Sequence, residues 1–404
     1  MNYVISIFLG MYLFGTFIEG LSIVKNIGLY GAILFFVIQL FKDRENSYKF
    51  YYKNNKLLLN SFFIFIFIIF LSVIFAYSDI KPSLREFRVE FLNIGIFMLI
   101  SLYIKDRKFL FNIFLYSIVF AFVYNTIRYG INYFIINPHL NFSIRLKRNY
   151  SDYFEILYPF VLGSLFIIRN KLKYIIFIIL LFGVFELILT GARGAWVNVI
   201  VETLLALLLI SFIKKEYIKK ILLISGIGML FISSGSLYIY NNSTLVKSKI
   251  NQGLQPSGRD KIIKTRLPLF LEHGNLIIGV GGPGNYQYNK LLNDYNAPRN
   301  YGYVDGKKFH YSADEPYLLQ IFYKEGVLGL FAFLFFSFIL FWKSIVFLRN
   351  SNNVSNKFFI FSIITSYFGY YFVRGLVEGR DFKYILIYLT LYLIIKEVKN
   401  VENN

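Results

Sequence analysis

The chain has 404 residues, of which 56% are hydrophobic and only 16% are charged, and its mean hydropathy is +0.54. These values place it in the membrane class, because a soluble core of this size does not need so many uncharged runs. The absence of cysteine excludes disulfide bonds, thiolate metal sites and a cysteine nucleophile. We assign the formal net charge of +20 to membrane-flanking loops rather than to nucleic acid, because no nucleic-acid-binding motif accompanies it.

Apolar runs recur along the chain, and each approaches the ~20 residues that a membrane-spanning helix needs. The N-terminus lacks a basic region and a small-residue cleavage site, so we expect the first run to be an uncleaved span. The pattern predicts an all-α polytopic membrane protein with about twelve transmembrane helices. The runs are 3–22, 26–41, 57–77, 89–104, 109–127, 153–168, 174–190, 195–213, 220–240, 320–342, 358–376 and 383–396.

Lysine-rich connections predict the orientation of these helices. They recur on one side of the chain's path, and basic residues mark cytoplasmic loops. We therefore expect a multi-pass protein of the cytoplasmic (inner) membrane with both termini in the cytoplasm. One large extracytoplasmic loop would then lie between about the ninth and tenth helices. The predicted division is 1–240 for helices 1 to 9, 241–319 for the catalytic loop, and 320–404 for helices 10 to 12 and a cytoplasmic tail.

Within the large loop, Ser257 is placed to cap a helix running from about Arg259 to Leu271, with Gly274 as its stop signal. The segment from Asn285 to Lys308 is rich in Asn, Tyr and Gly, and we expect it to be irregular.

The run from Gly279 to Tyr286 formally matches GxGxxG. A dinucleotide-binding fingerprint requires a βαβ unit, so that interpretation is rejected for an external membrane-protein loop. A backbone turn at the membrane surface, or a close approach to a ligand, explains the glycines better. The candidate loop-positioning residues are Gly279, Gly281, Gly284, Asn285 and Tyr286.

Arg193 lies at the start of a predicted helix, between Gly191 and Gly194 and close to Trp196. Two interpretations stay open. The segment is either a tight interhelical turn with interfacial side chains or an anion site, because helix N-termini and arginine both favour phosphate. The external side of the chain also uses arginine more than the cytoplasmic side does, and Arg374 and Arg380 are among these arginines.

Three side chains before the tenth apolar run are candidate general bases, with Glu315 first and Asp314 and His310 behind it. The alternative for the two carboxylates is stabilisation of a helix start by the helix dipole. No metal-binding spacing accompanies them, so we expect no metal site.

Glu155, Glu186 and Glu202 fall inside predicted spans, where charge is expensive. They are expected to pair with arginine, to be protonated or to belong to a conduit, and structural pairing is favoured for Glu186 and Glu202.

Four motifs occur together in a fixed order, and their combination resembles the O-antigen ligase and polymerase family over about 190–335. The remaining helices agree with that family only in topology. The motifs are Arg193-Gly194-Ala195-Trp196, Ser257-Gly258-Arg259, Gly279 to Tyr286, and Leu318-Leu319-Gln320 followed by Glu325-Gly326-Val327-Leu328-Gly329-Leu330.

The resemblance implies a membrane glycosyltransferase of the GT-C type that needs no metal or soluble cofactor. It implies transfer, with inversion, of an undecaprenyl-diphosphate-linked oligosaccharide to a glycan acceptor at the outer face of the membrane. Arg193 and Arg259 match the family's diphosphate-binding arginines, and Arg266 is a third candidate for that role. The expected partners are these two glycans, membrane lipids and a chain-length regulator protein, without nucleic acid.

One departure separates this chain from the ligases, which resemble it but carry a His-Asn pair where Glu315-Pro316 stands here. The departure favours a polymerase of O-antigen or capsular polysaccharide. A ligase that transfers glycan to lipid A core or another surface acceptor is the alternative. A transporter or flippase of lipid-linked oligosaccharide is the third possibility, although the large loop does not follow the two-fold repeat of many transporters.

Overall fold

The computed structural model describes most of the chain outside the 211–258 segment and a few short gaps. The described ranges are 1–42, 48–132, 144–168, 170–210, 259–295, 301–304, 307–310 and 316–401, with the isolated positions 135, 213, 219, 222, 226, 247 and 251. The regular secondary structure of these residues is helical apart from one two-stranded hairpin.

Every apolar run predicted to span the membrane coincides with a described helix, except 220–240, which lies outside the described residues. Six described helices are long and apolar enough to cross a membrane, so the chain is a multi-pass membrane protein. The helices that coincide with the predicted runs are α1 (Asn2–Thr16), α2 (Ser22–Lys42), α3 (Tyr48–Ile74), α4 (Ile80–Tyr103), α5 (Arg107–Ile131), α6 (Ile144–Ile167), α7 (Leu172–Leu189), α8 (Arg193–Ile210), α13 (Tyr317–Asn350), α14 (Val354–Phe368) and α15 (Lys383–Val401). The six candidate spans among them are α2, α3, α5, α7, α8 and α13.

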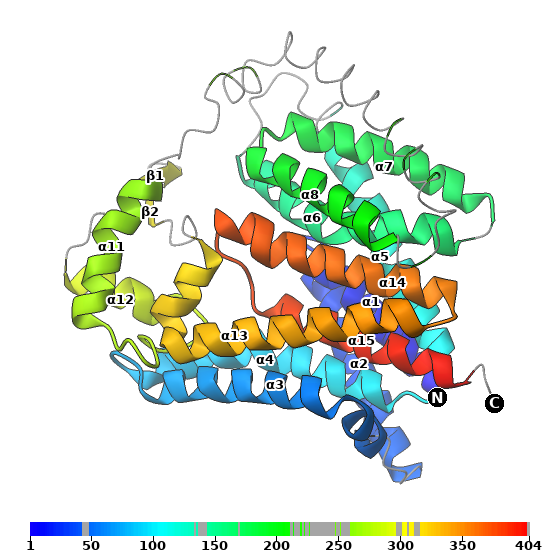
Figure 1. Ribbon diagram of the computed structural model, residues 1–404, viewed down its shortest axis with the longest axis horizontal. Helices are drawn as coiled ribbons and strands as arrows, with labels where there is room; N and C mark the ends of the chain where they lie inside the picture. Colours follow the sequence, from blue (N-terminus) through cyan, green and yellow to red (C-terminus); the bar gives the residue numbers. More distant parts are fainter. Residues whose placement is uncertain are drawn as a thin grey trace.

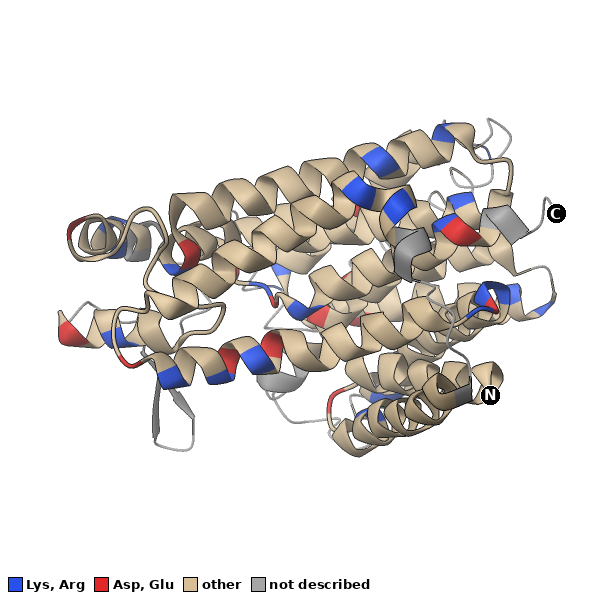
Figure 2. Ribbon diagram, turned by 90° about the horizontal axis from the view of Figure 1, so that it is seen from below, with Lys and Arg blue, Asp and Glu red and all other residues tan. Residues whose placement is uncertain are grey.

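The long helices lie side by side, and the two chain termini lie at one end of the array (Figure 1). The described elements within 259–310, which belong to the segment predicted to be extracytoplasmic and here called the external segment, lie at the opposite end. Long stretches of helix carry no charged residue, and basic residues gather toward the end that holds the termini (Figure 2). This distribution follows the pattern expected of spans whose ends meet water.

The helix α15 is the most enclosed of the array, with Tyr384, Tyr388 and Tyr392 each at most 3% exposed. These tyrosines recur at the i, i+4, i+8 spacing of one helix face. The hydroxyl group of Tyr388 lies 2.7 Å from Ser366 Oγ of α14. A hydroxyl group buried in the array thus finds a protein partner, which it needs where water is excluded.

The external segment contains α11 (Arg259–His273), α12 (Tyr286–Asp294) and the antiparallel strands β1 (Tyr301–Val304) and β2 (Lys307–His310). The helix α11 agrees with the predicted helix from Arg259, whereas the expectation of an irregular 285–308 segment is wrong. The helix α12 forms because Tyr288, Leu291 and Leu292 lie on one apolar face, and they are buried in a small satellite core with Phe270 of α11.

The helix α13 is broken near its start by Gly326, whose φ is 69° and ψ is −169°. The break frees backbone groups, and the segment 276–281 satisfies them. Val280 N–H donates to Tyr323 O at 3.0 Å and Gly281 N–H donates to Lys324 O at 3.1 Å. In return, the N–H groups of residues 327 and 328 donate to the carbonyls of residues 276 and 277. The external segment is thereby fastened to α13 without leaving buried backbone groups unpaired.

Candidate active site

The predicted anion-binding motif begins at a tight turn between α7 and α8. Gly191 has a φ of 67°, which an L side chain rarely adopts. Thr190 Oγ1 accepts a hydrogen bond from Ala192 N at 3.1 Å, and Trp196 Nε1 donates to Leu187 O at 3.0 Å. These contacts fix the start of α8 and leave Arg193 half-buried at its first position.

The end of α14 approaches this helix start through two irregular turns, the π-helix η2 (Gly369–Val373) and the 3₁₀-helix η3 (Arg374–Leu376). Gly369 packs against the carboxylate of Glu202 on α8, and a Cβ there would collide with it. Gly194 packs against the guanidinium group of Arg374 in the same way. Only glycine at both positions permits α8 and the end of α14 to approach so closely.

Two buried arginines and three carboxylates form an ion network beside Gly194. Arg374 Nε lies 3.1 Å from Glu155 Oε1, and Arg374 NH2 lies 3.0 Å from Glu378 Oε2. Arg380 NH2 lies 3.2 Å from the same Glu378 oxygen, and Arg380 NH1 lies 3.5 Å from Asp152 Oδ1. The side chains of Arg374 and Arg380 are 4% and 2% exposed.

The charges of this network decide what it can do. Two cations face three carboxylates, so the network carries no surplus positive charge for a diphosphate. Burial alone lowers the pKa of Arg380, but the neighbouring Asp152, Tyr370, Glu155 and Glu378 outweigh it and raise the pKa overall. The network therefore acts as a rigid support for the start of α8 rather than as an anion site itself.

The start of α13 packs against the same support. The ring of Tyr317 lies 5.2 Å from that of Tyr371, and Gly375 lies against Tyr317 Cβ. Gly379 packs on the side-chain amide of Gln320, where a Cβ would stand 2.6 Å from its atoms. The chain therefore enters α13, directly after the predicted base at 315, beside the arginine–carboxylate network.

The other predicted catalytic and diphosphate-binding residues fall differently in the structure. Asp314 and Glu315 lie outside the described residues. Arg259 is the first residue of α11 and His310 is the last of β2, and the structure describes only the backbone at both positions. Arg266 is 2% exposed and its NH1 group donates to Tyr288 Oη at 2.7 Å, within the satellite core of α11 and α12. Its position favours a packing role over a diphosphate contact.

The predicted loop-positioning residues lie between α3, α4 and α13. Gly279 and Gly281 have φ angles of 77° and 120°, and a Cβ on either would collide with neighbouring backbone. A Cβ on Gly284 would collide with the carboxylate of Glu86 on α4. Glu86 Oε1 accepts hydrogen bonds from the N–H groups of Asn285 and Tyr286, each at 3.1 Å. The glycine run thus brings the start of α12 onto the start of α4.

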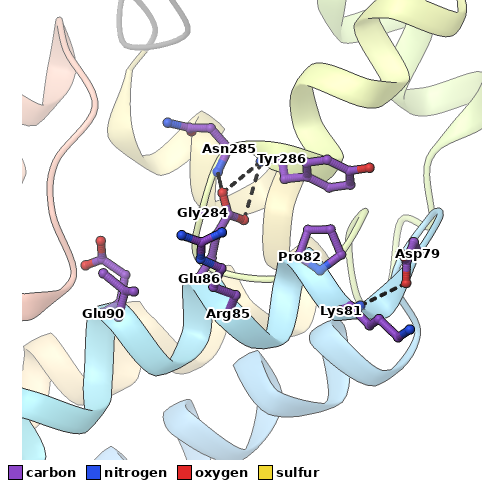
Figure 3. A pocket seen from close by; sticks show the side chains of 10 residues that line it. Asp79, Lys81, Pro82, Arg85, Glu86, Glu90, Gly284, Asn285 and Tyr286 are labelled. Carbon is purple, nitrogen blue, oxygen red and sulfur yellow. Dashed lines mark hydrogen bonds between the residues drawn. The ribbon is translucent and has the colours of Figure 1, made fainter.

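A cleft of about 680 Å³ opens where these two helix starts meet (Figure 3). Seven of the ten residues that line it have polar side chains. The residues that line it are Asp79, Lys81, Pro82, Arg85, Glu86, Val89, Glu90, Gly284, Asn285 and Tyr286.

Several site residues were not predicted from the sequence. Arg374 and Arg380 were recognised only as members of a group of external arginines, and Asp152 was not singled out. The signal that was available is the dense polar stretch from Arg374 to Asp381, which interrupts an otherwise apolar C-terminal region. Its partner carboxylates lie more than two hundred positions away in the sequence, so no local pattern indicates the pairing.

The three membrane carboxylates have different partners. Glu155 pairs with Arg374, whereas Glu202 accepts a hydrogen bond from Asn198 Nδ2 at 3.1 Å. Glu186 packs against Gly130 and lies near Tyr150, whose hydroxyl group donates to Gly183 O at 3.1 Å. Among the residues that the structure describes, Glu155 therefore has an arginine partner. Glu186 and Glu202, for which structural pairing was favoured, do not.

Fold and site together define a multi-pass helical membrane protein whose polar site lies at one end of its helices, beside the external segment. Residues 175–334 match a protein family described as O-antigen ligase. This match confirms the resemblance to the O-antigen ligase and polymerase family. The matched residues run from α7 into α13 and include Arg193, Arg259 and the glycine run. No curated protein matches the chain.

Proposed function

We propose that the protein is a polymerase of O-antigen or capsular polysaccharide that works at the outer face of the cytoplasmic membrane. The observation that carries the proposal is the family match over 175–334, which includes both the helix start at Arg193 and the external segment. The contact between Gly194 and Arg374 supports it, because it fixes the backbone of the Arg193 motif within a buried ion network.

In the proposed reaction a hydroxyl group of one lipid-linked repeat unit attacks the anomeric carbon of another. A new glycosidic C–O bond forms, and the C–O bond to undecaprenyl diphosphate breaks. Arg193 and Arg259 would stabilise the diphosphate as it gains negative charge, which lowers the barrier when the cations are already in place. Arg374 would act as a positioning residue for Arg193. Attack opposite the leaving group inverts the anomeric centre, and none of these steps assigns a role to a metal ion.

The proton of the attacking hydroxyl group must pass to a base. Glu315 is the first candidate, followed by Asp314 and His310, because Glu315 directly precedes the N-cap position of α13 and α13 begins beside the ion network. Glu315→Gln keeps the shape of the side chain and removes its basicity, so it should abolish product formation without loss of folding.

A ligase is the second candidate, and the description of the matched family favours it. The deciding experiment incubates purified protein with lipid-linked repeat units and separates the products by size. A ladder of increasing length supports the polymerase. Transfer only after addition of lipid A core or another acceptor supports the ligase. Flipping of labelled lipid without either product would contradict both.

The diphosphate assignment has its own test. Arg193→Ala and Arg259→Ala should each lower the yield of product at least a hundredfold, because removal of one preorganised charge-stabilising donor typically costs about 10²–10³ in rate. Arg349→Ala, an exposed position at the far end of α13, is the matched control. If either of the first two variants keeps full activity while its protein level is normal, that arginine has no role on the diphosphate.

A further inference from the structure

A series of contacts connects the cleft between the starts of α4 and α12 with the arginine–carboxylate network. Glu90 lies at one end of its lining and close to Lys383. Lys383 Nζ pairs with Asp381 at 2.6 Å, and Asp381 N–H donates to Tyr370 Oη at 3.3 Å. The guanidinium group of Arg380 lies 4.8 Å from the ring centre of Tyr370. A chain of contacts therefore joins the cleft to the network that supports Arg193.

The lining has the chemistry of a saccharide site. Tyr286 is 40% exposed and Val89 is 60% exposed, so an aromatic ring and apolar carbon are accessible to a ligand in the cleft. The side chains of Asn285, Lys81 and Arg85 are exposed beside them. Sugars present both C–H faces that pack on aromatic rings and hydroxyl groups that bond with amides, carboxylates and guanidinium groups.

The charge of the cleft argues against an anionic ligand. Its lining holds three carboxylates, Asp79, Glu86 and Glu90, against two cations, Lys81 and Arg85. A diphosphate or a phospholipid headgroup would meet more negative than positive charge there, whereas a hydroxyl-rich saccharide can use groups of either sign.

Two of the polar groups are already fixed. The carboxylate of Glu86 is held by the N–H groups of Asn285 and Tyr286, and Asp79 Oδ1 accepts a hydrogen bond from Lys81 N at 3.0 Å (Figure 3). The position of Tyr286 relative to α4 is therefore set before any ligand binds. Such preorganisation lowers the entropy cost of binding.

We propose that this cleft binds the sugar units of the acceptor glycan and directs its attacking hydroxyl group toward the site at Arg193. The inference rests on the proposed glycosyl transfer and adds the place where the acceptor is recognised. Tyr286 would stack on a sugar ring, and Arg85 would bond with its hydroxyl groups. The donor diphosphate would lie elsewhere, at Arg193 and Arg259.

The test uses the full-length protein in detergent and the oligosaccharide repeat unit released from its host's lipid-linked pool by mild acid. Binding is measured by saturation-transfer NMR titration. Tyr286→Ala and Arg85→Ala should each weaken binding about fivefold, as expected when one stacking or charge-assisted contact is lost. Tyr295→Ala and Arg88→Ala are matched controls, because both residues are exposed on the same two helices or their ends and neither lines the cleft. They should bind like the wild type.

A kinetic arm identifies which glycan the cleft holds. The two cleft variants should raise the KM for the acceptor about fivefold with little change in kcat or in the KM for the donor. The reason is that the lost contact stabilises the bound acceptor equally in the ground state and in the transition state. A rise in the donor KM alone would overturn the assignment to the acceptor. Binding and acceptor KM equal to those of the wild type in both variants would overturn the proposal altogether.

Two further outcomes are distinguishable. In one, the immobilised protein is tested for binding to phosphatidylglycerol vesicles and to phosphatidylcholine vesicles. If Arg85→Ala weakens binding to the phosphatidylglycerol vesicles more than to the phosphatidylcholine vesicles and leaves oligosaccharide binding intact, the cleft is a lipid-headgroup site and the proposal fails. If the wild type forms neither ladder nor transferred glycan, the proposed function fails. If the wild type forms product and the cleft variants form it with an unchanged acceptor KM, only this inference fails.

Discussion

At the scale of single residues, Gly194 gives the sharpest test of the site. A Cβ at this position would collide with the Arg374 guanidinium group, which is itself held by ion pairs to Glu155 and Glu378. In Gly194→Ala, either the network breaks or the start of α8 moves. Overpacking costs about 1–3 kcal/mol, and a shift of about 1 Å at a reacting group can cost about 10² in rate. We expect product formation to fall by at least about tenfold.

Gly95→Ala is the matched control. It makes the same change inside α4, where a Cβ would meet nothing within 4 Å. Replacing glycine by alanine within a helix typically adds about 0.5–1 kcal/mol of stability, so this variant should melt slightly higher and retain activity. Product yield and thermal unfolding in detergent decide the matter. Equal activity in the two alanine variants would show that the contact with Arg374 does not matter for function.

The same residue shows what the sequence reveals and what it does not. The motif around Arg193 was predicted from local features, namely glycines, a helix start and a tryptophan. Its contact with Arg374 could not be predicted, because that contact depends on how α14 ends in a π-turn against Glu202. A π-turn leaves no reliable pattern in the sequence and is often found at functional sites.

At the scale of elements, α12 depends on a cap that comes from another helix. The first N–H groups of a helix lack partners within it, and here Glu86 of α4 accepts from two residues at its start. Loss of such a capping group typically costs about 0.5–2 kcal/mol. Glu86→Ala should therefore speed hydrogen exchange at the backbone amides of α12 by roughly fivefold, which corresponds to about 1 kcal/mol.

Lys290→Ala tests whether any change in α12 has this effect. Lys290 Nζ pairs with Asp294 Oδ1 at 2.7 Å on the exposed side of the same helix, and such exposed pairs contribute little. Exchange in α12 should stay close to that of the wild type in this variant. Comparable acceleration in both variants would mean that α12 is marginal by itself and that the contact with Glu86 is incidental.

This cap also explains why the segment after Asn285 was expected to be irregular. The local sequence signals for a helix start are weak there, because the side chain of Asn285, the N-cap residue, makes no capping hydrogen bond. The stabilising groups come from α4 and from the satellite core around Phe270 and Tyr323. By contrast, α11 was predicted because Arg259 to Leu271 is bounded by its own signals, with Gly274 N–H donating to Phe270 O at its end. Elements stabilised locally are predictable, whereas elements stabilised by distant partners are not.

At the scale of the whole molecule, the long helices follow directly from the apolar runs. In a bilayer the backbone must satisfy its own hydrogen bonds, so an apolar run of sufficient length has few structures available other than a helix. The arrangement of the helices relative to one another does not follow from the apolar runs, since α15 comes last in the sequence yet packs beside α4, α5 and α14. Apolar residues on all sides of a helix do not specify which neighbour each side meets.

The orientation of the molecule in the membrane is open to a direct measurement, because the chain has no cysteine of its own. Single cysteines for labelling can replace exposed lysines at the two ends of the array, namely Lys264 on α11 and Lys105 between α4 and α5. If basic residues set the orientation as expected, a membrane-impermeant maleimide should label Lys264→Cys in intact cells. Lys105→Cys should be labelled only after the membrane is permeabilised.

The unmodified chain provides the blank for both variants, and glycan production shows that each variant is folded. The reverse pattern would place the external segment, with Arg259 and the cleft at Tyr286, in the cytoplasm. Lipid-linked repeat units presented at the outer face could not then reach these residues. Orientation therefore bears on the chemistry directly: the proposed polymerase, its diphosphate-binding arginines and its acceptor cleft all require α11 and α12 to lie on the side opposite to Lys105.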